Sequence, residues 1–230
     1  MRAACKRTLA HLRIEQLDLY LVHWPCAWAH IGPDLEWGPE KSRMPADEEG
    51  DALMADVPLQ ETWRAMEALV DDGLVKHIGV SNFNVQALND VLTYARIRPA
   101  VLQVEMHPYL AQSGLRAFCR KSGVTITAYS PLGRPGQHGD GPLLLEDSVV
   151  RAIAVRLAMT PSQVLLKWGL QMGHAVIPKS SNGARQAENM AAATALAELP
   201  ADDMAALNAL DCGHRFCLFP TWCRGASCFA

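Results

Sequence analysis

Several features that would mark a membrane, secreted or nucleic-acid-binding protein are missing from the sequence. No apolar run approaches the ~20 residues that a membrane-spanning helix needs. Met1-Arg2-Ala3 does not lead into the apolar core of a signal peptide. The 21 basic and 24 acidic residues leave a formal net charge of only -3, which gives no basic footprint for nucleic acid or anionic lipid. We therefore expect a cytoplasmic protein with no membrane partner and no nucleic-acid partner.

The seven cysteines lack the spacing of a metal site and the context of a disulfide framework. Their number is odd and no secretory signal is found, which favours reduced thiols. Cys212, Cys217, Cys223 and Cys228 gather near the C-terminus without the paired C-x-x-C of a zinc site. We interpret residues 212–230 as a C-terminal tail and expect no metal, with a metal site in this tail as the alternative.

The G-x-G-x-x-G fingerprint of dinucleotide-binding doubly wound folds is also absent. Gly133, Gly136, Gly139 and Gly141 do not have that spacing, and they do not lie in a strand-to-helix turn. These glycines indicate a flexible loop instead.

What the sequence does contain is a repeated order of strand and helix. Half of the 230 residues are apolar, which is enough for a full core. Short apolar runs predict strands, and helical periodicity predicts helices between them. The expected strands cover residues 17–23, 75–80, 100–105, 124–129 and 175–177; the expected helices cover 2–12, 59–71, 84–92, 115–120, 146–157, a segment from 160, 183–196 and 202–210. This alternation predicts an α/β fold, either a doubly wound sheet or a (β/α) barrel, over residues 1–211 with an insertion loop at 26–58.

Polar side chains follow the ends of these expected strands. The clearest case is the stretch GLVKHIGVSNFN, residues 73–84, where the apolar run of 75–80 changes abruptly to Ser81-Asn82 and Asn84 can cap the next helix. In parallel α/β proteins, ligands bind at the carboxyl edge of the sheet. The sequence therefore places candidate site residues at the strand ends.

His23 follows the first expected strand and precedes Trp24-Pro25. A neutral imidazole can polarise a carbonyl oxygen or act as acid or base, and the alternative is a strand-end histidine bonded to the backbone. Ser81, Asn82 and Gln103 can together hold a planar carboxamide, or they can cap loops. Tyr129 can stack on a flat ring or belong to the core.

Lys179 and Ser180 follow the last expected strand, and Arg185 lies in the opening of the next helix. A point charge, a hydroxyl, a planar guanidinium and a helix N-terminus together suit a phosphomonoester. The alternative is a solvated basic face.

Six motifs then bring a family resemblance. LDLYLVHWP, GLVKHIGVSNF, QVEMHPYL, ITAYSPLG, VIPKS and the R-x-x-E-N of Arg185 to Asn189 fall in the order and separation seen in the aldo-keto reductases. From Arg2 to about Asp211, the sequence resembles that family. The resemblance implies a TIM (β/α)8 barrel, here a partial barrel that lacks about the first three βα units. It also implies NADPH-dependent reduction of small aldehydes and ketones.

The resemblance assigns a role to each candidate residue. His23 resembles the active-site histidine, and Trp24 a wall of the substrate pocket. The remaining roles concern NADP(H). Ser81, Asn82 and Gln103 resemble the clamp on the nicotinamide carboxamide, and Tyr129 resembles the ring stacked against the nicotinamide. Ser130 and Leu132 lie in the family's pyrophosphate loop, and the site for the adenosine 2′-phosphate and adenine is resembled by Lys179, Ser180, Arg185 and Asn189, with Glu188 alongside.

The family's other catalytic groups, a tyrosine acid, a lysine and an aspartate, would lie before the first helix of this sequence. Tyr20 is a poor substitute, because its strand parity with Asp18 and Val22 directs it away from the face of His23. We therefore expect weak turnover or none. The alternatives are a non-catalytic NADP(H)-binding or interaction protein and a fragment of an incomplete gene model. The carbonyl substrate and the oligomeric state are left open.

Overall fold

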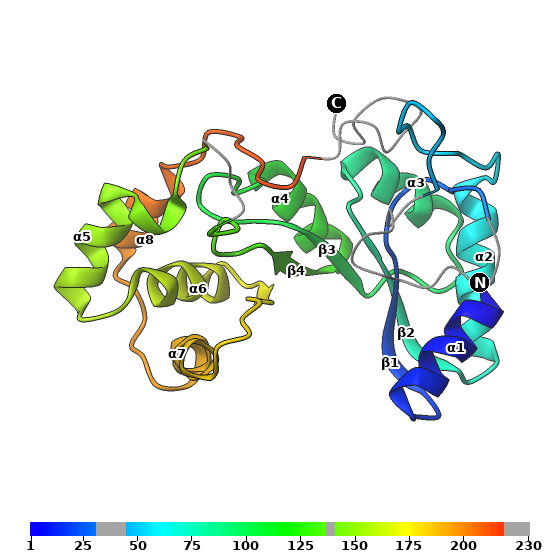
Figure 1. Cartoon of the computed structure of the whole chain (residues 1–230), viewed down its shortest axis with the longest axis horizontal. Helices are drawn as coiled ribbons and strands as arrows, with labels where there is room; N and C mark the ends of the chain where they lie inside the picture. The colour runs from blue at the N-terminus through cyan, green and yellow to red at the C-terminus, as the bar shows by residue number, and fades with distance from the viewer. Residues whose placement is uncertain (31–44, 137–140, 219–230) are drawn as a thin grey trace. The chain divides into compact units, whose positions relative to one another are not determined.

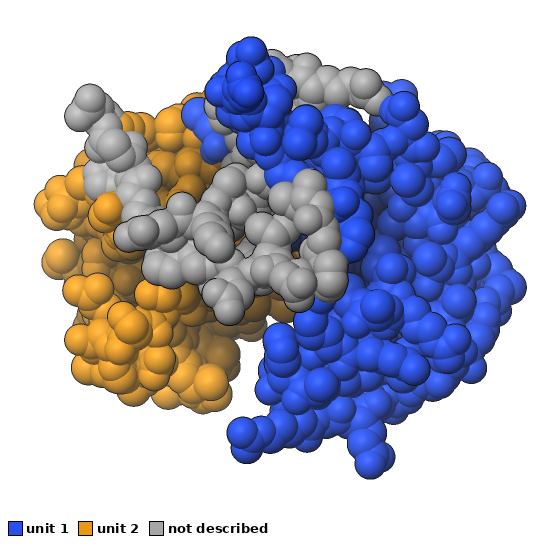
Figure 2. Space-filling view, turned by 45° about the vertical axis from the view of Figure 1, so that its right-hand side comes forward, with its two compact units in different colours: residues 1–100, 218–230 blue, residues 101–217 orange. Residues whose placement is uncertain are grey.

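The structure is a computed structural model that describes residues 1–30, 45–136 and 141–218 (Figure 1). The chain divides into two compact units, which Figure 2 distinguishes by colour. Unit 1 comprises Met1–Ala100 and Leu218–Ala230, and unit 2 comprises Val101–Cys217. In both units parallel strands alternate with helices.

The described residues of unit 1 form two strands and three helices. In chain order these are α1 (Arg2–Leu12), β1 (Leu17–Val22), α2 (Leu59–Asp71), β2 (Val75–Ser81) and α3 (Val85–Tyr94). Strands β1 and β2 are parallel and pair Leu19 with His77 and Val22 with Val80. They lie side by side in Figure 1. The strands therefore end at the same edge, as the sequence predicts.

The core of unit 1 lies between α2 and β2. Trp63, Met66 and Leu69 recur on one face of α2 and are almost completely buried, as are Ile78 and Val80 of β2. Burial of such large apolar side chains is the main stabilising contribution to this packing.

The helix ends of unit 1 follow the sequence expectations. Gly73 takes a left-handed conformation (φ 71°) just after α2, where a residue with a Cβ would be strained. The Asn84 side chain accepts a hydrogen bond of 2.8 Å from the Ala87 amide and caps α3. The predicted end of the 59–71 helix and the predicted Asn84 cap are confirmed.

Unit 2 contains three strands, five α-helices and one 3₁₀ turn in its described residues. In chain order these are β3 (Val101–Glu105), α4 (Ser113–Ser122), β4 (Thr125–Tyr129), the 3₁₀ turn η1 (Leu144–Glu146), α5 (Ser148–Leu157), α6 (Pro161–Gln171), β5 (Ala175–Val176), α7 (Gly183–Thr194) and α8 (Ala201–Asn208). The parallel order β3-β4-β5 brings three more strand ends to one edge.

Several predicted helix boundaries differ from the structure by one or two residues, and the start of α5 shows a physical reason. The sequence predicts a helix over residues 146–157, whereas the chain forms η1, leaves helical geometry at Asp147 and begins α5 at Ser148. The Asp147 side chain accepts hydrogen bonds from the Val149 and Val150 amides. A capping aspartate has extended backbone angles, so the helix can begin only after it.

Helix α6 is the central helix of unit 2. Thr160 and Gln163 form a reciprocal capping box at its start, and Pro161 occupies the first turn. Leu165, Leu166 and Trp168 are buried along its length. No single described helix is long and apolar enough to cross a membrane; α5 and α6 meet that test only as a pair bent by 94°.

Gly169 allows α6 to approach β5 closely, and its replacement tests this packing. A Cβ at Gly169 would lie 2.8 Å from Cγ1 of Val176, whose β-branched side chain has few alternative rotamers. We expect Gly169→Ala to lower the free energy of unfolding by about 1–3 kcal/mol, measured by urea denaturation.

Gly114→Ala is the matched control, because Gly114 lies in α4 and nothing is within 4 Å of a Cβ built there. Alanine at that site should be neutral or stabilise by up to about 1 kcal/mol. Equal effects of the two substitutions would contradict a close approach at Gly169.

Candidate functional site

In unit 1, a side-chain hydrogen bond ties the ends of β1 and β2 together. Nδ2 of Asn82 donates to the backbone oxygen of His23 at 3.0 Å and lies 3.3 Å from Oγ of Ser81. Ser81 and Asn82 are each only 3% exposed, whereas His23 is exposed. The backbone of His23 is thus held while its ring faces solvent.

Trp24 lies beside His23 at this strand end. The two ring centroids are 5.8 Å apart, with the planes inclined by 33°, and Trp24 itself is buried. The described parts of the 26–58 loop return to this region, since the amide of Ala55 donates to the backbone oxygen of Ala27. An exposed imidazole against a buried indole can contact a small substrate.

Two residues at strand ends have left-handed backbone conformations. Asn82 follows β2 with φ 63°, and Ser130 follows β4 with φ 50°. Positive φ is uncommon for residues other than glycine, and such strain persists where the surrounding structure enforces it, often at functional sites. Both positions are among the residues that the sequence predicts to bind a coenzyme.

In unit 2, the loops after β4 and β5 enclose a cavity of about 470 Å³. Five predicted coenzyme residues line it: Ser130, Leu132, Lys179, Ser180 and Arg185. The other lining residues are Pro131, Arg134, Pro135, Ile177, Pro178, Ser181 and Asn182. The structure therefore brings together residues that are up to 55 positions apart in the sequence.

The cavity is cationic. Lys179, Arg185 and Arg134 line it, and none of its described lining residues is an aspartate or glutamate. The first turn of α7 also borders it, where the Asn182 side chain accepts from the Arg185 amide at 3.1 Å. Cationic side chains beside a helix N-terminus suit a phosphate group.

The remaining predicted residues of unit 2 lie outside this cavity. Gln103 is in β3, where its backbone pairs with Thr127 of β4. Tyr129 ends β4, and burial, with the nearby Cys217 and Glu105, raises its pKa. The last two are on α7: the Glu188 carboxylate accepts a hydrogen bond of 2.6 Å from Oγ1 of Thr160, and Asn189 is half-buried.

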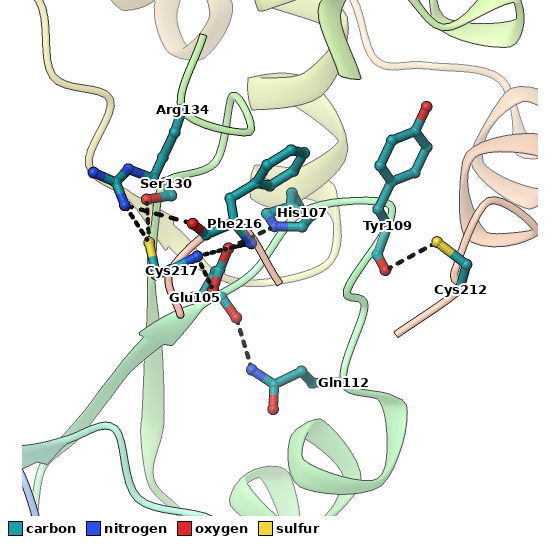
Figure 3. A network of polar contacts seen from close by, with 9 residues as sticks. All are labelled: Glu105, His107, Tyr109, Gln112, Ser130, Arg134, Cys212, Phe216 and Cys217. Carbon is teal, nitrogen blue, oxygen red and sulfur yellow. Dashed lines mark hydrogen bonds and ion pairs between the residues drawn. The ribbon is translucent and has the colours of Figure 1, made fainter. Parts of the chain in front are cut away.

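A buried carboxylate that sequence reasoning missed lies at the end of β3. Glu105 is 1% exposed and accepts hydrogen bonds from the amides of Phe216 (2.7 Å) and Cys217 (3.2 Å), while Nε2 of His107 lies 3.1 Å away (Figure 3). Burial alone would raise its pKa, but the contacts with His107 and the two amides outweigh burial and lower the pKa of Glu105. Glu105 therefore anchors the described start of the predicted C-terminal tail.

Further contacts hold the same segment. The Phe216 ring packs on His107, with centroids 4.9 Å apart, and Sγ of Cys217 lies 3.4 Å from Oγ of Ser130. A guanidinium nitrogen of Arg134 lies 3.8 Å from that sulfur (Figure 3). Residues 216 and 217 thus contact the loop that borders the cationic cavity. The one signal for this in the sequence is an acidic residue at the end of an apolar strand.

No metal site is found in residues 1–30, 45–136 and 141–218, where no three His, Cys, Asp or Glu side chains lie close enough to hold an ion. Cys223 and Cys228, which belong to the predicted tail, lie outside the described residues.

Comparison with known proteins places these features in a family context. A sequence model described as "Aldo/keto reductase family" matches residues 1–211. Aldose reductase B of Dictyostelium discoideum is 44% identical over 224 residues, which are 97% of this chain and 68% of that protein. Aldo-keto reductase family 1 member A1 of Cricetulus griseus is 46% identical over 193 residues, which are 83% and 57%.

Solved structures agree with the sequence matches. The aldose reductase from Schistosoma japonicum superposes with a TM-score of 0.81 at 39% identity, covering 93% of this chain and 64% of that one. The aldose reductase from Giardia lamblia gives 0.79 at 40% identity, covering 90% and 66%. The chain thus spans 57–68% of the length of these relatives, and the predicted α/β fold of the TIM-barrel type is confirmed.

The Glu105 anchor generates a stability prediction. Glu105→Gln places an amide nitrogen or a weaker acceptor against two buried N–H donors, and should lower the free energy of unfolding by about 3 kcal/mol at pH 7. Because the folded-state pKa of Glu105 is lowered, its contribution is present above about pH 4.3 and is lost as the pH falls through the folded-state value. Urea denaturation at several pH values measures both effects.

Glu146→Gln is the control, since that carboxylate is 56% exposed in its pair with Arg151. It should change stability by less than about 0.5 kcal/mol. An equally small effect at Glu105 would show that the anchor does not stabilise the fold.

Proposed function

The chain belongs to the aldo/keto reductase family, and from this premise we propose that it binds NADP(H) and acts in the reduction of carbonyl groups of small aldehydes and ketones. The cationic cavity carries the proposal. It is formed by the residues whose motifs match the family, and its chemistry suits a phosphorylated nicotinamide coenzyme.

The donors of the cavity fit the coenzyme's phosphates. Lys179 and Arg185 would hold the adenosine 2′-phosphate, one as a point charge and the other through a planar fork. Ser130 and Leu132, in the loop after β4, would hold the pyrophosphate. Asn189, with Glu188 alongside it on α7, would contact the adenine.

The nicotinamide end would meet the other strand-end residues. Ser81, Asn82 and Gln103 offer the hydroxyl and amide groups that a carboxamide requires, and Tyr129 offers a ring face. When bound, NADPH supplies a hydride for the carbonyl carbon. The similarity to a protein named a probable NAD(P)H-dependent D-xylose reductase, from Arthroderma otae at 43% identity, supports a nicotinamide coenzyme.

His23 would orient the substrate. Its exposed imidazole donates a hydrogen bond to the carbonyl oxygen, and Asn82 fixes the backbone from which the ring projects. Trp24 would form one wall of the substrate pocket.

Carbonyl reduction also requires a proton donor, and three tyrosine hydroxyls of the described residues are hydrogen-bonded or have raised pKa values. The Tyr20 hydroxyl hydrogen-bonds Thr8 of α1, and burial raises its pKa. The Tyr109 hydroxyl donates to Asp147, and burial raises the pKa of Tyr94 to about 12. With these hydroxyls so placed, we propose that the 230 residues bind the coenzyme but turn over slowly, since general acid catalysis contributes about 10²–10⁴-fold.

Coenzyme binding is tested by fluorescence titration of the chain with NADPH and NADH. Arg185→Gln and Lys179→Met should each weaken NADPH binding by about 10- to 100-fold, because each removes a charge-assisted contact. NADH binding should change little. Arg151→Gln, an exposed charge removal on α5, is the control and should leave both affinities unchanged. Equal losses for both coenzymes would contradict a 2′-phosphate site at these residues.

Turnover is tested by following NADPH oxidation with a small aldehyde. The chain should show a slow rate that falls further in His23→Asn and is unchanged in Tyr20→Phe. A rate typical of an efficient reductase that is unchanged in Tyr20→Phe would refute the proposal that this chain turns over slowly for want of a general acid. Binding with no rate at all would instead favour the non-catalytic alternative.

A further inference from the structure

Unit 2 has a second cavity. Whereas the cationic cavity lies at the ends of β4 and β5, this one lies at their starts. Its volume is about 460 Å³, and it lies where β4 begins and just before β5. Arg116 and Arg120 of α4 line one side, and Gly173 and His174 line another. None of its described lining residues is an aspartate or glutamate.

The two arginines are four residues apart, so their side chains share one face of α4. Across the described ranges, no carboxylate lies within 4 Å of either guanidinium. Arg116 makes a long hydrogen bond, 3.4 Å, to the backbone oxygen of Ala111. Burial and the neighbouring Arg120 lower the pKa of Arg116, against a smaller opposing influence of Asp211. Two like charges thus line one cavity, and in the part of the chain that the structure describes neither has a carboxylate within 4 Å.

His174 adds a buried ring nitrogen that no described residue contacts by a hydrogen bond. The residue is 6% exposed, and within the described part of the chain its Nε2 has no hydrogen-bond partner. Burial, reinforced by the charge of Arg116, lowers the pKa of His174 to about 4, so the ring is neutral at pH 7. A neutral imidazole can still donate one N–H to an acceptor. Buried polar groups normally have partners, so this nitrogen indicates a missing hydrogen-bond partner, which is an acceptor when Nε2 carries the proton.

We propose that this cavity binds a small organic anion whose carboxylate or phosphate oxygens accept hydrogen bonds from Arg116, Arg120 and His174. The apolar side chains of Val124 and Met172 line the same space and suit a short carbon body. The volume lies in the range of small-molecule sites. The site is separate from the coenzyme cavity, and it does not depend on the proposed function.

The chemistry of the lining argues against a metal ion and against a reactive thiol in this cavity. Two guanidiniums repel a metal cation. Cys119 also lines the cavity, but burial raises its pKa to about 11, which leaves the thiol protonated and a poor nucleophile. A negatively charged group that accepts hydrogen bonds can pair with both guanidiniums and the imidazole at once.

The test uses inorganic phosphate and citrate as probes, added to the full chain carrying Arg185→Gln so that the coenzyme cavity loses a phosphate contact. Binding is followed by the NMR signals of the His174 imidazole, assigned by their loss in His174→Gln. We expect saturable shifts and a raised pKa of His174 when the probe is bound, because an adjacent anion favours the imidazolium. Arg120→Gln should weaken binding at least about tenfold.

Lys121→Gln is the matched control, because it removes the same charge from the same helix but does not line the cavity. It should leave the affinity of both probes within about twofold. No saturable shift of the His174 signals, or equal weakening by Arg120→Gln and Lys121→Gln, would overturn the proposal.

Discussion

The structure depends on how the chain leaves its parallel strands. At β2 and β4, the residue after the last strand position turns into the left-handed region, at Asn82 and Ser130. This turn ends the backbone ladder and directs polar groups to the carboxyl edge of the strands, where parallel α/β proteins bind ligands. Holding Asn82 and Ser130 in this conformation costs local stability, and such strain is typical of sites where the position of a side chain serves a function.

Charge is distributed to match these edges. In unit 2, a cationic cavity borders the loop after β4, while the buried carboxylate of Glu105 lies at the end of the neighbouring β3. Glu105 binds backbone amides rather than the cavity's cations, so the two charges do not neutralise each other. Cys217 and Arg134 connect the two regions, since the thiol approaches the guanidinium. The carboxylate positions the chain, and the cations are left for a ligand.

Local sequence patterns predicted the elements of the fold because the forces that set them are local. Apolar periodicity gave α2 and β2, and capping chemistry gave the starts of α3 and α6. The boundary of α5 failed because Asp147 can continue a helix or cap one, and only the packed chain decides between them. The family motifs identified five residues that the structure brings together at the cationic cavity, but not the geometry of that cavity.

Contacts between distant segments could not be predicted in this way. Glu105 and Phe216 are 111 residues apart, and no pattern in either segment indicates the other. In the sequence, Arg116 and Arg120 are typical of the basic end of a surface helix. In the fold they line the same cavity as His174, which precedes β5. Folding half-buries Arg116 and buries His174, whose Nε2 has no partner among the described residues, while Arg120 stays exposed. Burial is a property of the packed fold and cannot be read from either segment alone.

We propose above all that the loops after β4 and β5 form the coenzyme's phosphate site. A crystal structure of this chain grown with NADP⁺ tests it most directly. The account predicts the pyrophosphate against residues 130–132 and the 2′-phosphate between Lys179 and Arg185. NADP⁺ bound elsewhere on the protein, with that cavity empty, would contradict it.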